Sequence, residues 1–166
     1  IQNGTTVFMI LFRVNFSCYF LILIKQWKNI FRDEELRLYF AIILCSIGLI
    51  AWNTFGLYGT LEETIRHAAF QVGSIITTTG FATTDFDLWP SFSKTILVCL
   101  MMVGACAGST GGGMKIARLM LIMKSLRRNI RKTLNPRKVM AVRNNGIVID
   151  EQILDNTNAY LAAYVL

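Results

Sequence analysis

Two irregular stretches of this chain decide its fold: Thr77-Thr-Thr-Gly-Phe81 and Gly104-Ala-Cys-Ala-Gly-Ser-Thr-Gly-Gly-Gly-Met-Lys115. Each follows a segment that is apolar enough to be a helix in a membrane. Polar, glycine-rich backbone is costly in hydrocarbon unless it lines a water-filled path or is buried in protein. The first stretch therefore indicates an ion-coordinating turn, and the second indicates a helix break at membrane depth.

The composition favours a membrane protein over a soluble domain. Of the 166 residues, 54% are hydrophobic, and the mean hydropathy is +0.48. Ordinary soluble domains are about 45–50% apolar, so we expect roughly three to five membrane spans. The chain begins close to one apolar run, 7–12, and stops inside another, 159–166. We therefore expect it to be a fragment of a longer membrane protein.

The basic residues are distributed as the positive-inside rule requires. Of the 17 Lys and Arg residues, ten fall in 115–143 and four in 25–37, and the stretch between these clusters holds only two. The net charge of +7 therefore indicates a membrane and not a nucleic acid as the partner. The expected cytoplasmic segments are 25–37 and 115–150, and the expected outer segments are around 59–64 and 84–94.

Apolar runs, charge clusters and breaker residues divide the chain into eight segments. Asn135-Pro136 predicts a helix stop, and Asn144-Asn-Gly146 predicts a tight turn. The predicted segments are the end of a preceding transmembrane helix (1–24), a cytoplasmic link (25–38), a transmembrane helix (39–58), a re-entrant pore helix (60–76), a filter and outer loop (77–94), a broken transmembrane helix (95–123), a basic cytoplasmic link (124–150) and the start of another transmembrane helix (151–166).

The segment 60–76 is expected to enter the membrane without crossing it. It opens with a capping box in which Thr60 is the N-cap and Glu63 stands three residues on. Only its second half is apolar, which suits a re-entrant helix better than a spanning one. Its partly negative C-terminal end would point at the Thr-Gly turn, and that polarity favours a cation there.

The turn after this helix has the parts of a potassium filter. Such filters replace the hydration shell of the ion by backbone carbonyls from a short Thr- and Gly-rich strand, and glycine permits the positive φ this requires. The predicted filter residues are Thr77, Thr78, Thr79, Gly80 and Phe81, with K⁺ as the transported ion at Thr78, Thr79 and Gly80. Asp85 and Asp87 would concentrate cations at the outer mouth. The plain alternative is a polar turn after a helix.

The second stretch is predicted to be a flexible constriction or gate. Three successive glycines break a helix, since each costs about 1 kcal/mol relative to Ala. A phosphate loop would require a Lys directly after the last glycine and a Ser or Thr after that Lys, which are missing. The predicted gating residues in 104–113 are Gly104, Gly108, Ser109, Thr110, Gly111, Gly112 and Gly113. Lys115 and Arg118 lie about one helical turn apart and are expected to snorkel to the cytoplasmic surface.

Nothing in the sequence predicts covalent catalysis, and we expect no catalytic residues and no covalent cofactor. The four cysteines lie in apolar stretches without metal-ligand spacing, so they are expected to be small buried residues. Two rival classes stay open. One is a membrane enzyme with Asp85, Asp87 and His67 as acid-base groups, and the other is a non-conducting structural module.

Both loops together resemble one family, the pore subunits of Trk-type (TrkH-like) potassium transporters. The residues that carry the resemblance are the TTTGF turn and the Cys106-Ala-Gly-Ser-Thr-Gly-Gly-Gly113 run. Further matching stretches are Asn15-Phe-Ser-Cys-Tyr-Phe20, Trp27, Phe31-Arg-Asp-Glu-Glu-Leu-Arg37, Asp87-Leu-Trp-Pro90 and Asn135-Pro136. The related sodium-dependent Ktr-type subunits are a poorer match to the glycine run and remain the alternative.

The resemblance implies an all-α membrane fold with a helix, a re-entrant pore helix, a filter loop and a broken helix. Four inequivalent repeats of this unit would surround one pore, and this chain would hold the end of the second repeat, the third, and the start of the fourth. Thr77–Phe81 would be the third filter strand, and 104–113 the gating loop beneath it. The resemblance further implies potassium uptake, a multi-pass subunit of the cell inner (plasma) membrane, a homodimer, and a cytoplasmic nucleotide-binding (TrkA-like) regulatory partner.

Overall fold

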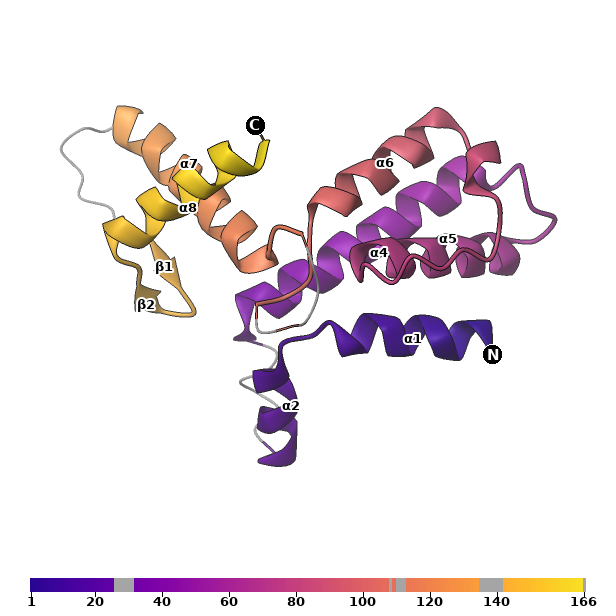
Figure 1. Cartoon of the computed structure of the whole chain (residues 1–166), viewed down its shortest axis with the longest axis horizontal. Helices are drawn as coiled ribbons and strands as arrows, with labels where there is room; N and C mark the ends of the chain where they lie inside the picture. Colours follow the sequence, from indigo (N-terminus) through magenta and orange to yellow (C-terminus); the bar gives the residue numbers. More distant parts are fainter. Residues whose placement is uncertain (26–31, 108, 110–112, 135–141, 166) are drawn as a thin grey trace.

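The computed structural model describes residues 1–25, 32–107, 109, 113–134 and 142–165, and these residues are almost entirely helical. Helices α4, α5 and α6 pack together, α1 lies against α5, and α7 pairs with α8 (Figure 1). In chain order the elements are α1 (Gln2–Phe12), α2 (Phe16–Leu23), α4 (Glu34–Thr54), α5 (Leu61–Ile76), the 3-10 helix η1 (Phe86–Leu88), α6 (Ser91–Met102), α7 (Ile116–Leu134), β1 (Arg143–Asn144), β2 (Ile147–Val148) and α8 (Glu151–Val165).

The segment 1–24 was predicted to be the end of one transmembrane helix. In the structure this apolar segment forms two helices, α1 and α2. Helices α1 and α2 meet at an angle of 97°. The break follows from Asn15, whose side-chain oxygen accepts a hydrogen bond from the backbone N–H of Ser17 at 2.9 Å. Asn15 therefore starts a new helix. Arg13, the C-cap residue of α1, donates a hydrogen bond to the hydroxyl of Thr78, which follows α5.

Helix α4 is the described helix that is long and apolar enough to cross a membrane, and the bent pair α1–α2 adds a second if it counts as one span. The helix runs from Glu34 to Thr54, whereas 39–58 was predicted. The difference arises at the start, where Asp33 accepts a hydrogen bond from the Glu35 N–H at 2.9 Å and so caps a polar first turn. Charge alone is a poor guide to where a helix begins, because the dipole favours acidic residues there.

Helix α5 is the re-entrant candidate. Its predicted N-cap is confirmed, since the Thr60 hydroxyl accepts from the Glu63 N–H at 3.3 Å. Sixteen residues reach about 24 Å, which is less than the thickness of a bilayer core. From Phe70 to Ser74 every residue is buried, and α4 and α1 pack along this helix. The helix is thus enclosed by its neighbours instead of facing lipid all round.

The predicted broken helix, 95–123, consists of two separate helices. Helix α6 begins at Ser91, directly after Pro90, and ends at Met102. Helix α7 begins only at Ile116 and continues to Leu134, eleven residues past the predicted end and well into the predicted link 124–150. Figure 1 shows α7 turning away from the axis of α6. The described residues between the two helices, 103–107, 109 and 113–115, belong to neither helix.

The chain after α7 contains a small hairpin. Strands β1 and β2 pair antiparallel, and Asn145 and Gly146 between them have φ of 48° and 84°. Two positive φ values in succession define the type I′ turn that Asn-Gly favours, so the predicted tight turn is confirmed. The predicted helix stop at Asn135-Pro136 lies outside the described residues, as do Trp27 and Phe31.

The cysteines only partly follow the prediction that all are buried. Cys18 and Cys106 are buried, but Cys45 and Cys99 are exposed on the surfaces of α4 and α6. Local hydropathy does not distinguish the buried cysteines, Cys18 and Cys106, from the exposed ones, Cys45 and Cys99. In a membrane protein both the buried and the outward faces of a helix are apolar, because lipid covers the outside.

The Thr60 cap gives a test of the α5 start. Changing Thr60 to Ala removes the cap, which costs about 1 kcal/mol. We expect the melting temperature of the full-length protein in detergent to fall by roughly 1–3 °C. Thr95→Ala is the matched control, because its exposed hydroxyl donates within α6 and caps nothing. Equal melting temperatures for the two variants would contradict the capping role.

Candidate functional site

The turn at the C-terminal end of α5 closes in a Schellman arrangement. The Thr79 N–H donates to the Ser74 carbonyl at 2.9 Å, and the Thr78 N–H donates to the Ile75 carbonyl at 2.9 Å. The Gly80 N–H also points back to the Ser74 carbonyl, at 3.4 Å. The backbone N–H groups of Thr78, Thr79 and Gly80 therefore all donate to carbonyl oxygens of α5.

The backbone of the turn alternates in handedness. Thr78 has φ of 53° and Gly80 has φ of 78°, while Thr79 between them is not in the left-handed region. A β-branched residue rarely adopts positive φ, so Thr78 holds local strain that the surrounding structure must offset. The position that ends a helix in this way is normally a glycine. Strain of this kind is concentrated at functional sites in proteins.

The carbonyl oxygens of the turn differ from its N–H groups in their hydrogen bonding. Among the described residues, none donates a hydrogen bond to the carbonyls of Thr78, Thr79 or Gly80. Thr78 and Gly80 are exposed and Thr79 is half-buried. The turn thus presents oxygens and hides its N–H groups, which is the polarity that a cation requires.

The hydroxyl groups reinforce this arrangement. The Thr77 hydroxyl donates to the Gly73 carbonyl at 2.6 Å, and the Thr79 hydroxyl lies 2.7 Å from the Thr77 oxygen. Thr79 is accordingly the donor in that pair. Thr77 is fully buried, so its side chain fastens the turn to α5, whereas Phe81 is 64% exposed.

Three further charged groups, Arg13, Asp87 and Lys94, lie near the turn. Arg13, at the α1–α2 break, donates to the Thr78 hydroxyl at 3.4 Å. On another side, a cavity of about 410 Å³ is lined by residues that include Gly80, Asp87, Gln71 and Ser74. Asp85, the second predicted outer acid, caps η1 by accepting from the Asp87 N–H at 3.0 Å. The structure therefore brings Asp87, but not Asp85, to the cavity beside this turn.

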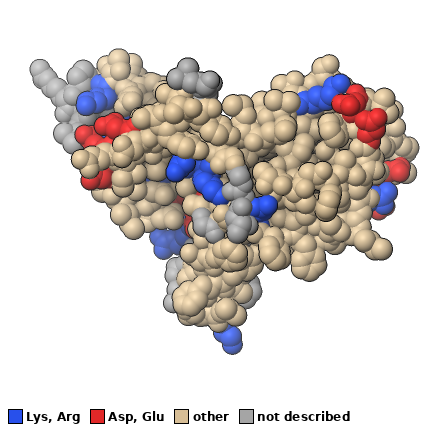
Figure 2. Space-filling model, viewed as in Figure 1, with Lys and Arg blue, Asp and Glu red and all other residues tan. Residues whose placement is uncertain are grey.

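Charge is scarce over the helices that carry the turn. Figure 2 shows that the surface over α4, α5 and α6 is almost uncharged, with acidic and basic residues gathered at the end farthest from α7. An uncharged flank with charge at one end is the pattern expected of a membrane segment.

The glycine loop pairs its two ends through the backbone. The Gly104 N–H donates to the Met114 carbonyl at 2.8 Å, and the Ile116 N–H donates to the Ala105 carbonyl at 3.2 Å. Gly113 has φ of 77°, and a Cβ there would lie 3.0 Å from the Gly104 Cα. Only glycine permits this approach. The predicted residues Gly108, Thr110, Gly111 and Gly112 lie outside the described residues.

A residue that sequence reasoning missed holds this loop. The Ala107 N–H donates to the side-chain carboxylate of Glu35, which is only 7% exposed at the start of α4. The only sequence signal was the acidic triplet 33–35, and helix capping accounts for acidic residues at such a position without any further role. The contact joins residues 72 positions apart, which no local pattern reveals.

The basic residues after the loop contact other protein groups, and their position at the cytoplasmic surface stays a prediction. The Lys115 ammonium donates to the Ser109 carbonyl at 3.0 Å, which closes the loop from its far end. The Arg118 guanidinium lies 4.0 Å from the ring centroid of Tyr160 on α8. Both cations therefore bind protein groups.

Comparison with known proteins assigns the chain to a family. The family described as "TrkH: Cation transport protein" matches residues 1–161, and the chain belongs to it. It is 31% identical to the Trk system potassium uptake protein TrkH of Escherichia coli, over 100% of this chain and 35% of that protein. It is 36% identical to the protein of the same name from Halomonas elongata, over 97% of this chain and 34% of that protein.

The fold agrees with this assignment. The crystal structure of the potassium transporter TrkH from Vibrio parahaemolyticus matches with a TM-score of 0.92 at 29% identity, covering 99% of this chain and 36% of that one. The predicted Trk-type resemblance and all-α membrane fold are therefore confirmed. The chain spans about a third of the length of these relatives.

The close approach of Gly113 to Gly104 can be tested directly. Gly113→Ala forces an L-residue into the left-handed region, which costs about 1–2 kcal/mol before any steric contact is counted. We expect a lower melting temperature and faster proteolysis of the full-length protein near the loop. Gly56→Ala is the control, since a Cβ there meets nothing within 4 Å and its φ is ordinary. Identical behaviour of the two variants would show that the loop tolerates separation of its ends.

Proposed function

We propose that this chain is part of a pore-forming subunit that carries potassium into the cell across the inner membrane. The proposal is supported by membership of the TrkH family and by relatives whose names describe potassium uptake. The chain supplies one helix, one re-entrant helix, one filter turn and one broken helix. Four such units would enclose a pore, so conduction would belong to the full-length protein.

In this proposal, dehydrated K⁺ is coordinated by main-chain oxygens of Thr78, Thr79 and Gly80, with Thr77 and Phe81 framing the strand. One observation carries the assignment: the amides of the turn are bound to α5, while the carbonyls of these three residues have no donor among the described residues. A ring of such oxygens replaces the hydration shell of the ion. Neither a protonatable pair nor a nucleophile is required, so the proposed function is not enzymatic.

The C-terminal end of α5 adds electrostatic support. A helix end carries about half a negative charge. At about 5 Å and an effective dielectric constant of about 20, this is worth about 1.7 kcal/mol to a monovalent cation. That is too little to bind an ion alone, which is consistent with a filter assembled from several repeats. Asp87 beside the cavity would raise the local cation concentration.

The loop 104–113 acts as the gate in this proposal. Its described ends are joined by backbone hydrogen bonds and by a glycine contact that other residues would disturb. Such pairing holds the described ends of the loop together, and these bonds must break before the ends can separate. The proposed partners follow from the family: a second copy of the full-length subunit, and a cytoplasmic nucleotide-binding (TrkA-like) subunit.

Substitution of Gly80 tests the filter. Gly80→Ala in the full-length protein should lower rubidium or potassium uptake and admit sodium, because Ala resists φ of 78° even though no atom lies within 4 Å of its Cβ. Uptake would be measured in cells that lack their own potassium uptake systems.

Gly59→Ala is the matched control, since its Cβ also meets nothing and its φ is ordinary. Unchanged uptake and unchanged selectivity in Gly80→Ala would reduce the turn to a structural role. Sodium-dependent uptake by the unsubstituted protein would instead favour the Ktr-type alternative.

A further inference from the structure

The first turn of α4 carries three successive acidic residues, and each has a different partner. Asp33 caps its own helix. The Glu35 carboxylate accepts from the Ala107 N–H in the glycine loop, 72 residues away. Glu34 forms an ion pair with Lys124 of α7, 90 residues away. One helical turn therefore touches both the loop and the helix that follows it.

The Glu35 carboxylate is largely shielded from water, so its hydrogen bond from the glycine loop matters for its stability. A carboxylate that is 7% exposed needs hydrogen-bond donors to offset its lost hydration. The Ala107 N–H is one such donor, beside Cys106, which is 1% exposed, and the Ala117 N–H and the Asn15 side chain also hydrogen-bond to this carboxylate. Moving this part of the loop away from α4 would leave a buried carboxylate without that donor. The contact therefore favours the loop position seen here.

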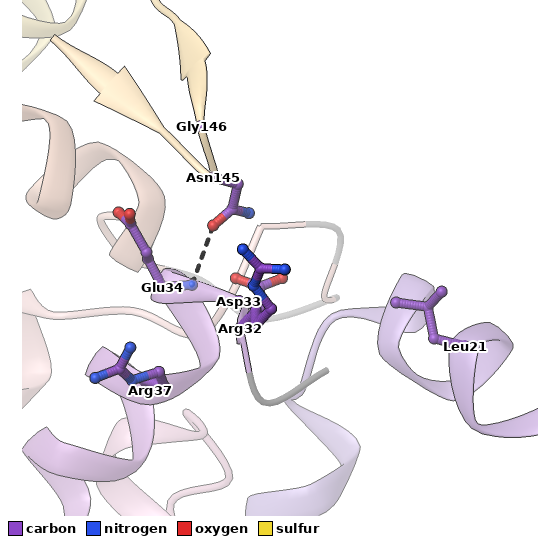
Figure 3. A pocket seen from close by; sticks show the side chains of 7 residues that line it. All are labelled: Leu21, Arg32, Asp33, Glu34, Arg37, Asn145 and Gly146. Atoms are coloured by element: carbon purple, nitrogen blue, oxygen red, sulfur yellow. Dashed lines mark hydrogen bonds between the residues drawn. The ribbon is translucent and has the colours of Figure 1, made fainter. Parts of the chain in front are cut away.

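The hairpin β1–β2 is attached to the same turn. The Asn145 side-chain oxygen accepts from the Glu34 N–H at 3.1 Å (Figure 3). Lys124 also donates to the Arg143 carbonyl at 2.8 Å, so this lysine bridges the helix turn and the hairpin. Figure 3 shows the hairpin tip placed directly over the start of α4.

Polar contacts, and not apolar packing, hold the hairpin there. Ile147 and Val148 of β2 are 70% and 55% exposed. The tip borders a cavity of about 640 Å³, lined in part by Leu21, Arg32 and Gly146. Segments with little buried apolar area and few hydrogen bonds open most readily. The hairpin is thus easily released, and its release would remove partners of Glu34.

We propose that Glu35 is a positioning residue for the glycine loop, and that Glu34, Lys124 and Asn145 complete a clasp that makes the loop position depend on the cytoplasmic hairpin. The inference rests on the proposed gating role of 104–113. With the clasp closed, the loop is held against α4. With the hairpin or α7 displaced, Glu34 loses its hydrogen bond to Asn145 or its ion pair with Lys124, and the loop is freed to move.

The test uses the full-length protein in liposomes and measures passive rubidium flux together with the rubidium-to-sodium ratio. Glu35→Ala and Glu34→Lys should each raise flux about tenfold at an unchanged ratio, the shift that one charge-assisted hydrogen bond produces in a two-state equilibrium. Combining Glu34→Lys with Lys124→Glu restores opposite charges and should return flux toward the unsubstituted level.

Glu62→Gln is the control, because it disrupts an exposed ion pair with Arg66 at the other end of the molecule. Flux equal to this control, lower flux, or no rescue by the charge exchange would overturn the clasp. Should Glu35→Ala fail to fold, Asn145→Ala tests the clasp from the hairpin side, because it removes the acceptor of the Glu34 N–H and should likewise raise flux. An unsubstituted protein without rubidium flux, or Gly80→Ala without effect, would overturn the proposed function instead.

Discussion

Every peptide group placed in a membrane must find a partner, and the end of α5 depends on how its last amides do so. The helix takes back the N–H groups of Thr78, Thr79 and Gly80, and the Thr77 hydroxyl fastens the turn from the buried side. The carbonyl oxygens of these three residues accept no hydrogen bond from the residues that the structure describes. A turn whose N–H groups are bonded and whose carbonyl oxygens are open presents partial negative charge, before any acidic side chain contributes.

The backbone groups of the glycine loop also need hydrogen-bond partners, and several of the described ones find them in other parts of the chain. Its ends satisfy each other across the gap between α6 and α7, where glycine lets two backbones approach within van der Waals contact. Where the backbone cannot supply an acceptor, Glu35 does. The two irregular regions therefore differ in character: the filter turn is fixed to its own helix, whereas the loop is fixed to residues distant in sequence. The second kind of attachment is the easier one to regulate.

Membership of the TrkH family and the agreement of the fold place these two regions in a larger assembly. About a third of the length of the relatives is present in this chain. Within the described residues, α4, α5 and α6 pack on one another and α1 packs against α5. These contacts hold the turn after α5 and the described ends of the glycine loop in place.

The sequence by itself determined the membrane class, the helix α5 with its Thr60 cap, the Asn145–Gly146 turn and the family, since each depends on local pattern or short motifs. It misjudged the continuity of 1–24, the start of α4 and the exposure of Cys45 and Cys99, because capping and lipid-facing surfaces leave the hydropathy unchanged. Only the tertiary structure decided which groups meet: Glu35 with the loop, and Asn145 with the start of α4. Such contacts join residues 72 and 111 positions apart, and folding geometry alone brings them together.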